Sequence, residues 1–435
     1  MVKRPITLGW TPASSERLEI YCVGTPTLSR SLPVVGGNFN PQWTTNLAPR
    51  KWADQHRRRT RWGGIDNLGG SAALCMHLVV ASARRCIVST MPRALILGGT
   101  GMIGRATAAR LLAAGWEVDV TGRDPSHVPA AFEGEGATFL TASRDSPSEM
   151  AAAIGDGADL LVDCICYTAG DATSLLPLAR DATSTVMISS KAVYVDDAGH
   201  HSNSSVAPRF AGPILETQPT MAPGDIDYTT RDGYGANKVA AERVLLDSDL
   251  PVTVIRPSKI HGAGAQRPRE WVFIKRVLDR RSAVLLANRG AGIDHPTAAV
   301  NLAALIEVIA ANPGPRILNS ADPDAPSALE ISRAIAGILD HVWEEVLLNG
   351  DADVTFGQHP WDVPHPIVLD MTAAIDLGYV PVGSYEKTVT AEVEWLVSLV
   401  SEGGPSVELP PGLDDSFFES LFDYAAEDRY LADRH

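Results

Sequence analysis

A tyrosine and a lysine stand four residues apart in the segment "YGANKVAAERVLL" (234–246), where apolar residues recur at helical spacing. Residues at this spacing share one face of a helix, so the side chains of Tyr234 and Lys238 are expected to be neighbours. A free phenol has a pKa of about 10, too high for an efficient base at neutral pH, and a nearby ammonium lowers it by stabilising the phenolate. The pair could therefore exchange a proton with a substrate oxygen. Taken alone, the same spacing is more typical of surface packing.

A glycine-rich turn lies upstream, in "LILGGTGMIGRATAARLLAAGWEVDVTGR" (95–123). A short apolar strand precedes the turn, an apolar pattern of helical period follows it, and a second strand closes the unit. Glycines at this place let a pyrophosphate approach the backbone, and the helix N-terminus offers free N–H groups and a positive potential. The sequence therefore predicts a dinucleotide site formed by Gly98, Gly99, Thr100, Gly101, Met102, Ile103 and Gly104.

The end of the second strand indicates which dinucleotide would bind. NAD-binding domains usually have an Asp or Glu here, which accepts hydrogen bonds from the ribose 2′-hydroxyl. This chain has Gly122 and Arg123 instead, with Arg105 directly after the glycine-rich turn. A guanidinium can clamp a 2′-phosphate, so the sequence favours NADP. NAD stays open as a cofactor because Asp124 follows and could take the acidic role.

Strands and helices continue to alternate along the chain. The segments "ADLLVDCICYTAG" (158–170), "STVMISSKAVY" (184–194) and "LPVTVIRPSKIHG" (250–262) are typical of buried strands in a parallel sheet. We therefore expect an α/β fold with a Rossmann-like, doubly wound parallel sheet.

Three motifs in this order, "GGTGMIG", "ISSKAVY" and "YGANK", resemble the extended or atypical branch of the short-chain dehydrogenase/reductase superfamily, which includes the NAD(P)-dependent epimerase/dehydratase proteins. The resemblance covers residues 92–400 and implies a smaller C-terminal α/β substrate domain after residue 262, where the alternation weakens. It implies that Ser190 holds and polarises the substrate oxygen and that Tyr234 is the catalytic acid/base. Lys238 would then activate the tyrosine and bind the nicotinamide ribose of the cofactor.

The resemblance implies an NAD(P)-dependent oxidoreductase of the epimerase/dehydratase type, acting on a carbonyl or hydroxyl of a small molecule. Carbonyl reduction is favoured over nucleotide-sugar epimerisation or dehydration. A dehydratase normally has a carboxylate beside the hydroxyl of the serine motif, whereas Lys191 and Ala192 follow Ser190 here. A non-catalytic nucleotide- or RNA-binding relative is a further alternative, and the intact Ser–Tyr–Lys set counts against it.

The segment between the serine and tyrosine motifs departs from the family pattern. Ser190 and Tyr234 are 44 residues apart, a longer gap than is usual, and residues 195–233 are polar and rich in Pro and Gly. Loops of this length are commonly lids or binding loops. Further substrate contacts are expected from three residues for which pocket wall (Tyr167) or buried core (the histidines) is the more ordinary role: Tyr167, His261 and His295.

Composition bounds the setting and the partners. The chain has 435 residues, of which 45% are hydrophobic, and can bury a sizeable core. Five cysteines, an odd and small number, argue against a disulfide framework and favour a reducing, cytoplasmic setting. The net charge of -15 argues against a nucleic-acid or membrane partner. The expected partner is a small-molecule substrate, a homodimer is left open, and no metal site is expected.

The charge also divides the chain into regions. Residues 1–90 carry 12 Lys or Arg against 4 Asp or Glu and lack hydrophobic periodicity, which predicts a disordered or mis-assigned extension before a functional start at Met91. We expect a Rossmann domain over 91–262 with the Ser/Tyr/Lys site, and an interleaved substrate region over 263–400. The tail, 401–435, is acidic and contains a predicted amphipathic helix whose apolar stripe is Phe418, Leu421, Phe422 and Ala425.

Overall fold

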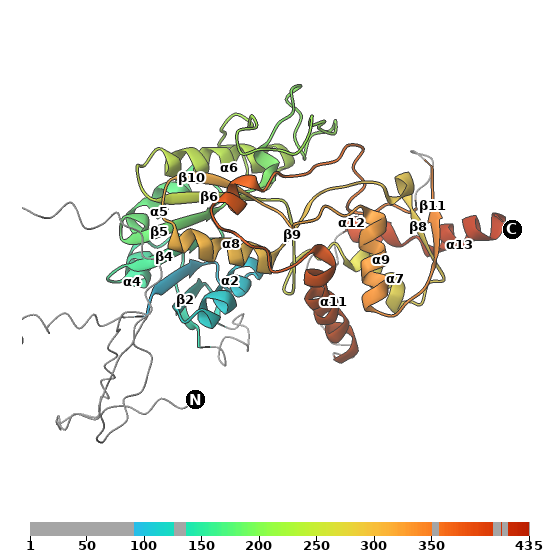
Figure 1. The fold of residues 1–435 in the computed structure, drawn as a ribbon, viewed down its shortest axis with the longest axis horizontal. Helices are drawn as coiled ribbons and strands as arrows, with labels where there is room; N and C mark the ends of the chain where they lie inside the picture. Colours follow the sequence, from blue (N-terminus) through green and yellow to red (C-terminus); the bar gives the residue numbers. More distant parts are fainter. Residues whose placement is uncertain (1–90, 126–135, 350–355, 403–409, 411–415, 435) are drawn as a thin grey trace, which may run out of the picture. The chain divides into compact units, whose positions relative to one another are not determined.

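This computed structural model, whose described residues are 91–125, 136–349, 356–402, 410 and 416–434, contains a seven-stranded parallel sheet with helices on both faces (Figure 1). The expectations for residues 1–90 lie outside these ranges. The strand order is β10-β6-β5-β4-β1-β2-β3, so the direction of winding reverses between β1 and β4. The strands are β1 (Arg93–Leu97), β2 (Glu117–Gly122), β3 (Thr138–Thr141), β4 (Ala158–Asp163), β5 (Ala182–Ile188), β6 (Val252–Pro257) and β10 (Arg316–Ser320).

Helices cover both faces of this sheet, as alternation along each buried strand requires. In β1, Ala94 and Ile96 face one side, where they pack with α2 (Met102–Ala113) and α8 (Ala299–Ala311). Leu95 and Leu97 face the other, with α4 (Pro147–Ile154), α5 (Ala169–Arg180) and α6 (Arg231–Leu246). The predicted Rossmann-like, doubly wound sheet is therefore confirmed.

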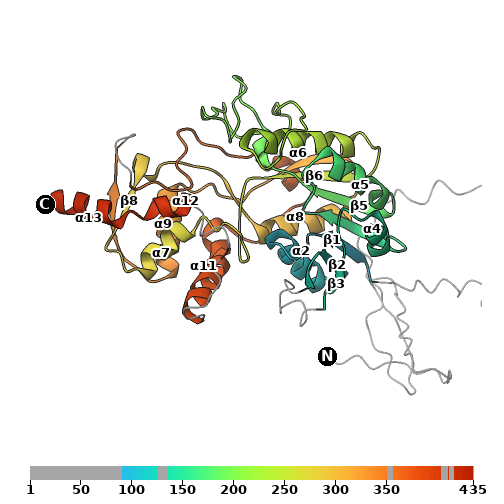
Figure 2. The ribbon, with the colours of Figure 1, turned by 180° about the vertical axis from the view of Figure 1, so that it is seen from behind.

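The chain after β6 builds a second group of elements, which Figure 2 shows on the far side of α8 from the sheet strands. Two short parallel pairs occur in it, β7 (Lys259–His261) with β9 (Pro296–Ala298), and β8 (Ala283–Leu286) with β11 (Glu344–Leu347). Its core is a separate apolar cluster that includes Phe273, Trp361 and Leu396. We call these elements the C-terminal lobe; its helices are α7 (Trp271–Leu278), α9 (Ala328–Ile338), α11 (Tyr385–Glu402), α12 (Ser416–Glu419) and α13 (Tyr424–Asp433). The short helix α10 (Thr372–Asp376) packs beside β10.

The predicted apolar stripe of the tail is only partly correct. Phe418 and Leu421 are buried, and Arg276 of α7 donates hydrogen bonds to the Leu421 carbonyl (2.7 Å) and to Glu427 (2.7 Å). Ala425 is exposed. A 3₁₀ turn over Ser420–Phe422 separates α12 from α13 and shifts the helical phase, so the stripe does not continue past it.

None of the helices in the described ranges is long and apolar enough to cross a membrane.

Candidate active site

The glycine-rich turn joins β1 to α2, and its glycines serve different purposes. Gly98 has a φ of +75°, and a Cβ there would lie 2.7 Å from Ile165 Cγ2. A Cβ on Gly104 would lie 2.5 Å from Gly99 Cα, so only glycine lets the helix pack on the turn. Gly101 is different: its φ is -77°, it is exposed, and a Cβ would meet only the Gly98 carbonyl oxygen, at 3.5 Å. Folding does not require glycine at that position, whereas close approach by a pyrophosphate does.

The N-terminus of α2 is suited to an anion. Gly101 offers no side-chain cap, and the first turn of the helix contains no acidic residue. The Arg105 Nε donates a hydrogen bond of 2.6 Å to the Thr100 carbonyl, which holds its guanidinium beside the turn. The turn lies where the strand order reverses between β1 and β4, the place at which doubly wound sheets bind ligands. The residues present therefore fit a dinucleotide phosphate.

Arg123 directly follows β2 and is exposed to solvent, as is Asp124. The turn and the end of β2 are adjacent, because a Cβ on Gly122 would lie 3.5 Å from Thr100 Cγ2. This places Arg123 at the strand end where such domains read the substituent on the adenosine ribose.

Lys238 is held at the carboxyl ends of β4 and β5. Its Nζ donates hydrogen bonds to the carbonyls of Cys166 (2.7 Å) and Ile188 (2.9 Å), and the residue is only 2% exposed. The same Nζ lies 4.4 Å from the ring centroid of Tyr167 and 5.9 Å from that of Tyr234. The structure therefore brings together the three predicted residues Tyr167, Tyr234 and Lys238.

Ser190 follows β5 and begins the 3₁₀ turn η2 (Lys191–Val193), where its Oγ accepts a hydrogen bond from the Ala192 N–H (3.1 Å). The turn packs on the first turn of α6, because a Cβ on Gly235 would lie 2.7 Å from the Ala192 carbonyl oxygen. Gly235 is the neighbour of Tyr234, so the serine and tyrosine are presented by two elements in contact. The Ser190 hydroxyl can still donate its proton to a substrate oxygen.

A buried ion pair that the sequence reading missed positions α6. Glu242 accepts hydrogen bonds from Arg256 Nε (3.0 Å) and Nη2 (2.6 Å), and from the Ser189 hydroxyl (2.5 Å). These contacts tie the helix that carries Tyr234 and Lys238 to the ends of β6 and β5. The available signal was spacing, since Glu242 comes four residues after Lys238 on the same helix.

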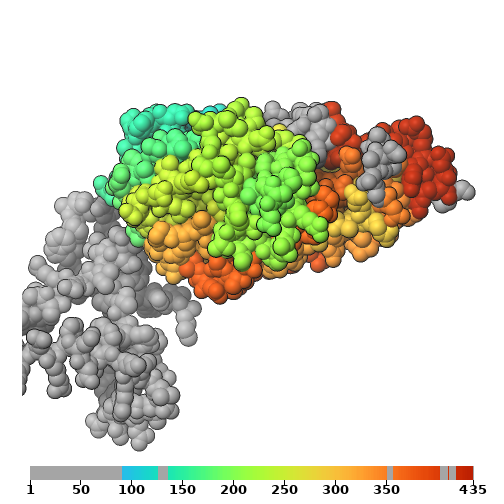
Figure 3. All heavy atoms as spheres, turned by 90° about the horizontal axis from the view of Figure 1, so that it is seen from above, coloured from blue at the N-terminus to red at the C-terminus, as the bar shows by residue number. Residues whose placement is uncertain are grey.

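The long segment 195–233 reaches the site through Tyr228. The Tyr228 ring stacks on Tyr167 with centroids 5.1 Å apart and an interplanar angle of 16°. Burial raises the pKa of the Tyr167 phenol, and the charge of Tyr234 raises it further. In Figure 3 the green spheres of this segment lie against the yellow-green spheres of α6. Sequence reasoning expected a lid or binding loop without identifying Tyr228, because no local pattern shows which loop residue folds back.

The two predicted histidines lie where the sheet meets the C-terminal lobe. Both ring nitrogens of His295 are used by backbone groups: Nε2 bonds to the Asp322 carbonyl (2.8 Å) and Nδ1 accepts from the Leu369 N–H (3.2 Å). Burial lowers the pKa of His295, so the ring is neutral and no nitrogen is left for a substrate. His261 is also buried, and its Nε2 bonds to Asp322 Oδ2 (2.9 Å). This geometry favours His295 as a buried core residue over His295 as a substrate contact.

The residue that follows Ser190 is a buried lysine, Lys191, and not an acid. Lys191 is buried and paired with Asp294, whose other oxygen lies 3.1 Å from Lys259 Nζ. Burial lowers the pKa of the Lys191 ammonium well below its ordinary value, and the charges of Lys259 and Arg269 lower it further. Neither Lys191 nor its neighbours in η2 supplies a carboxylic acid next to Ser190.

The doubly wound sheet, the glycine-rich turn at its switch point and the tyrosine and lysine beside it define a dinucleotide-binding protein of the short-chain dehydrogenase/reductase type. Residues 94–295 match the model of the NAD dependent epimerase/dehydratase family, so this part of the chain is similar to that family of enzymes.

Solved structures of such enzymes share the fold. One is the dTDP-glucose 4,6-dehydratase of Bacillus anthracis in complex with NAD, at 14% identity and a TM-score of 0.53, covering 70% of this chain and 96% of that one. Another is the UDP-glucose 4-epimerase of Thermus thermophilus in complex with NAD, at 17% identity and a TM-score of 0.51, covering 70% of this chain and 98% of that one. A third is the UDP-glucose 4-epimerase of Thermotoga maritima with UDP-glucose, at 17% identity and a TM-score of 0.53, covering 71% of this chain and 99% of that one. No curated protein sequence matches the chain.

Proposed function

We propose that this protein is an NADP-preferring oxidoreductase that acts on a carbonyl or hydroxyl group of a small molecule through Ser190, Tyr234 and Lys238. The observation that carries the proposal is the position of the Lys238 ammonium. It is fixed by two carbonyls at the carboxyl edge of the sheet, beside the rings of Tyr167 and Tyr234. The dinucleotide would be held by residues 98–104 and by the N-terminus of α2.

The chain's own residues then manage the proton and the substrate oxygen. A bound nicotinamide supplies the hydride acceptor or donor. In the reducing direction the Tyr234 phenol gives its proton to the substrate oxygen, and the nearby Lys238 ammonium stabilises the phenolate that remains. The Ser190 hydroxyl donates a hydrogen bond to the same oxygen and fixes its position. Tyr228 covers one face of the Tyr167 ring, on which it stacks.

Nucleotide-sugar epimerisation is the second candidate, because the chain matches nearly the full length of epimerase structures, including one with UDP-glucose. An epimerase returns the hydride to its substrate, so it would turn over without added NADPH and would co-purify with its cofactor. Dehydration is disfavoured because Lys191, paired with Asp294, occupies the position after Ser190.

Replacing Tyr234 by phenylalanine tests the proposed role of the phenol. We expect Tyr234→Phe to bind NADP+ as the wild type does while its activity falls about 10²–10⁴-fold, the usual contribution of a general acid or base. Carbonyl compounds assayed with NADPH and nucleotide sugars assayed without it form the substrate panel. Tyr430→Phe, on the distant helix α13, is the matched control. An active Tyr234→Phe enzyme would contradict the assignment.

A further inference from the structure

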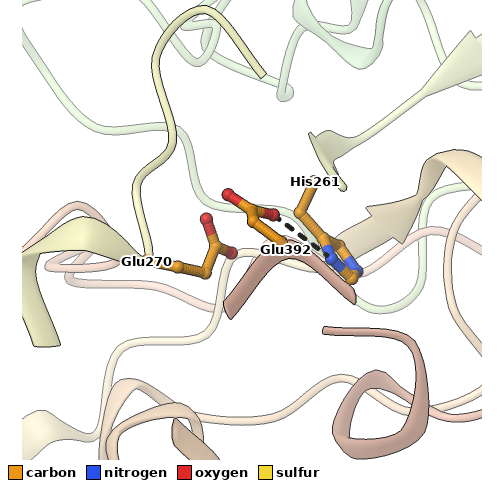
Figure 4. A group of neighbouring side chains, drawn as sticks. All are labelled: His261, Glu270 and Glu392. Atoms are coloured by element: carbon orange, nitrogen blue, oxygen red, sulfur yellow. Dashed lines mark ion pairs between the residues drawn. The ribbon is translucent and has the colours of Figure 1, made fainter. Parts of the chain in front are cut away.

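Three buried, ionisable side chains meet where the C-terminal lobe joins the sheet (Figure 4). His261 ends β7, Glu270 directly precedes α7, and Glu392 lies in the middle of α11. They are 2%, 3% and 0% exposed, and one ligand atom from each lies within 4.8 Å of the others. The mechanism proposed above uses none of the three.

The His261 ring is held in one orientation by a carboxylate behind it. Its Nε2 lies 2.9 Å from Asp322 Oδ2, and Asp322 Oδ1 accepts hydrogen bonds from the Ala298 N–H (2.7 Å) and the Asn301 amide (2.8 Å). With Nε2 bonded to Asp322, the other ring nitrogen, Nδ1, lies on the side of Glu392.

The atoms that face one another across the cluster lack partners. His261 Nδ1 and Glu392 Oε1 are both buried, and neither has a hydrogen bond within the described part of the chain. Nδ1 lies 3.9 Å from Glu392 Oε2, which accepts a hydrogen bond of 2.6 Å from the Gly262 N–H. Glu270 Oε1 accepts one from the Tyr385 hydroxyl, at 3.2 Å. A lone pair facing a carboxylate at that separation is unfavourable unless a proton or a metal cation lies between them.

The charged groups around the cluster also favour a bound cation. Burial raises the pKa of Glu392 well above its ordinary value, and the neighbouring charge of Glu270 raises it further. Arg269 lowers the Glu392 pKa but does not cancel these effects, and Lys259 is paired with Asp294. With Asp322, three buried carboxylates therefore surround one imidazole.

We propose that His261, Glu270 and Glu392 bind one divalent transition-metal ion, with Asp322 as the carboxylate that orients the histidine. One imidazole nitrogen and two carboxylates are a ligand set for Zn²⁺ or Mn²⁺, whereas Mg²⁺ prefers oxygen ligands alone. The arrangement of Asp322 behind His261 is the usual carboxylate–histidine–metal pattern. Ligand atoms at metal–ligand distances of about 2.1 Å cannot be more than ~4.2 Å apart, so the side chains would close slightly around the ion. Because β7, the residue before α7 and α11 each supply one ligand, the ion would tie three segments of the C-terminal lobe together.

Zinc binding by the full-length chain tests this site. After dialysis against a chelator, Zn²⁺ is titrated calorimetrically and metal content is measured by mass spectrometry, with Mn²⁺ as a second probe. We expect Zn²⁺ to bind at His261, Glu270 and Glu392 and to raise the unfolding midpoint by several degrees, because only the folded chain has the site.

Matched variants separate this site from other histidines and cysteines. Glu392→Gln keeps an oxygen for the Gly262 N–H but should lose one equivalent of Zn²⁺ and the rise in midpoint. Glu427→Gln changes an equally buried carboxylate, paired with Arg276, and should keep both. Glu270→Gln replaces Glu392→Gln if that variant fails to fold. A wild-type chain that binds neither metal, or ligand variants that bind as the wild type does, would overturn the proposal.

Discussion

The carboxyl edge of the sheet and the junction with the C-terminal lobe both contain buried charges, but they neutralise them differently. At the edge, Lys238 is held by two carbonyls and Glu242 by Arg256 and Ser189. At the junction, Glu392 and Glu270 face each other and the open nitrogen of His261.

At the edge the buried charges are already paired within the chain, whereas at the junction they would be balanced by a bound cation. Side chains whose charges are satisfied by fixed neighbours are already oriented for chemistry, which is the condition for efficient proton transfer and charge stabilisation. Carboxylates that face each other in the interior carry an electrostatic cost that a bound cation would remove. The edge therefore has the preorganisation that the proposed active site requires, and the junction is the place where the proposed ion would stabilise the fold.

The largest effect on stability is expected at Glu242. Glu242→Gln would leave Arg256 buried without its carboxylate and should lower the free energy of unfolding by about 3–5 kcal/mol. Glu345→Gln is the matched control, because Arg333 binds Glu345 in the same two-bond manner (2.7 and 2.6 Å) at a much more exposed position. Its cost should stay below about 1 kcal/mol. Equal losses in urea unfolding would mean that the Glu242 pair is no more important than a surface pair.

A smaller effect is expected at the exposed end of the edge. Arg123→Ala removes one charged hydrogen-bonding group, and a hydrogen bond to a charged group contributes about 1.5–3 kcal/mol. We therefore expect NADP+ affinity to fall about ten- to a hundredfold while NAD+ affinity changes little. Calorimetric titration of both nucleotides checks this. A parallel loss for NAD+ would show that Arg123 does not read the 2′-phosphate.

The smallest effect sharpens the contrast with the junction. In chelator-treated protein, Glu392→Gln changes a buried carboxyl group whose pKa burial raises and whose Oε1 has no hydrogen-bond partner in the described part of the chain. The free energy of unfolding should therefore change by less than about 1 kcal/mol, far less than for Glu242→Gln. Urea unfolding of the two variants side by side measures the difference. A loss at Glu392 as large as that at Glu242 would show that the two carboxylates are equally well paired.

Features encoded by local spacing were predictable from the sequence. The glycine-rich turn around Gly98, between its strand and its helix, is encoded by residues close together in the sequence. The placement of Tyr234 beside Lys238 follows from a spacing of four residues, about one helical turn. The position of Tyr167 beside Lys238 was also predictable, because Tyr167 follows a recognisable strand.

Features created by distant pairing were not predictable. Glu392 meets His261 across 131 positions of the chain, and Tyr228 reaches Tyr167 from a loop without a regular pattern. The single histidine and two glutamates have no metal-binding spacing in the sequence. The prediction that Ala425 lies on the tail's apolar stripe rests on one uniform helix. The 3₁₀ turn over Ser420–Phe422 interrupts that helix and changes the direction in which the Ala425 side chain faces.

The central claim, that the switch point between β1 and β4 binds a nicotinamide nucleotide, is tested most directly at Gly101. Its backbone conformation suits any residue, and a Cβ there contacts only one carbonyl oxygen, so Gly101→Val should fold with a loss of no more than about 1 kcal/mol. Its branched side chain would occupy the place of the pyrophosphate. Calorimetric titration should therefore show NADP+ binding to the wild-type chain and binding at least tenfold weaker to Gly101→Val, whose unfolding midpoint should lie within about 4 °C of the wild-type value. Equal binding by both proteins, or a folded wild-type chain that binds neither NADP+ nor NAD+, would contradict the claim.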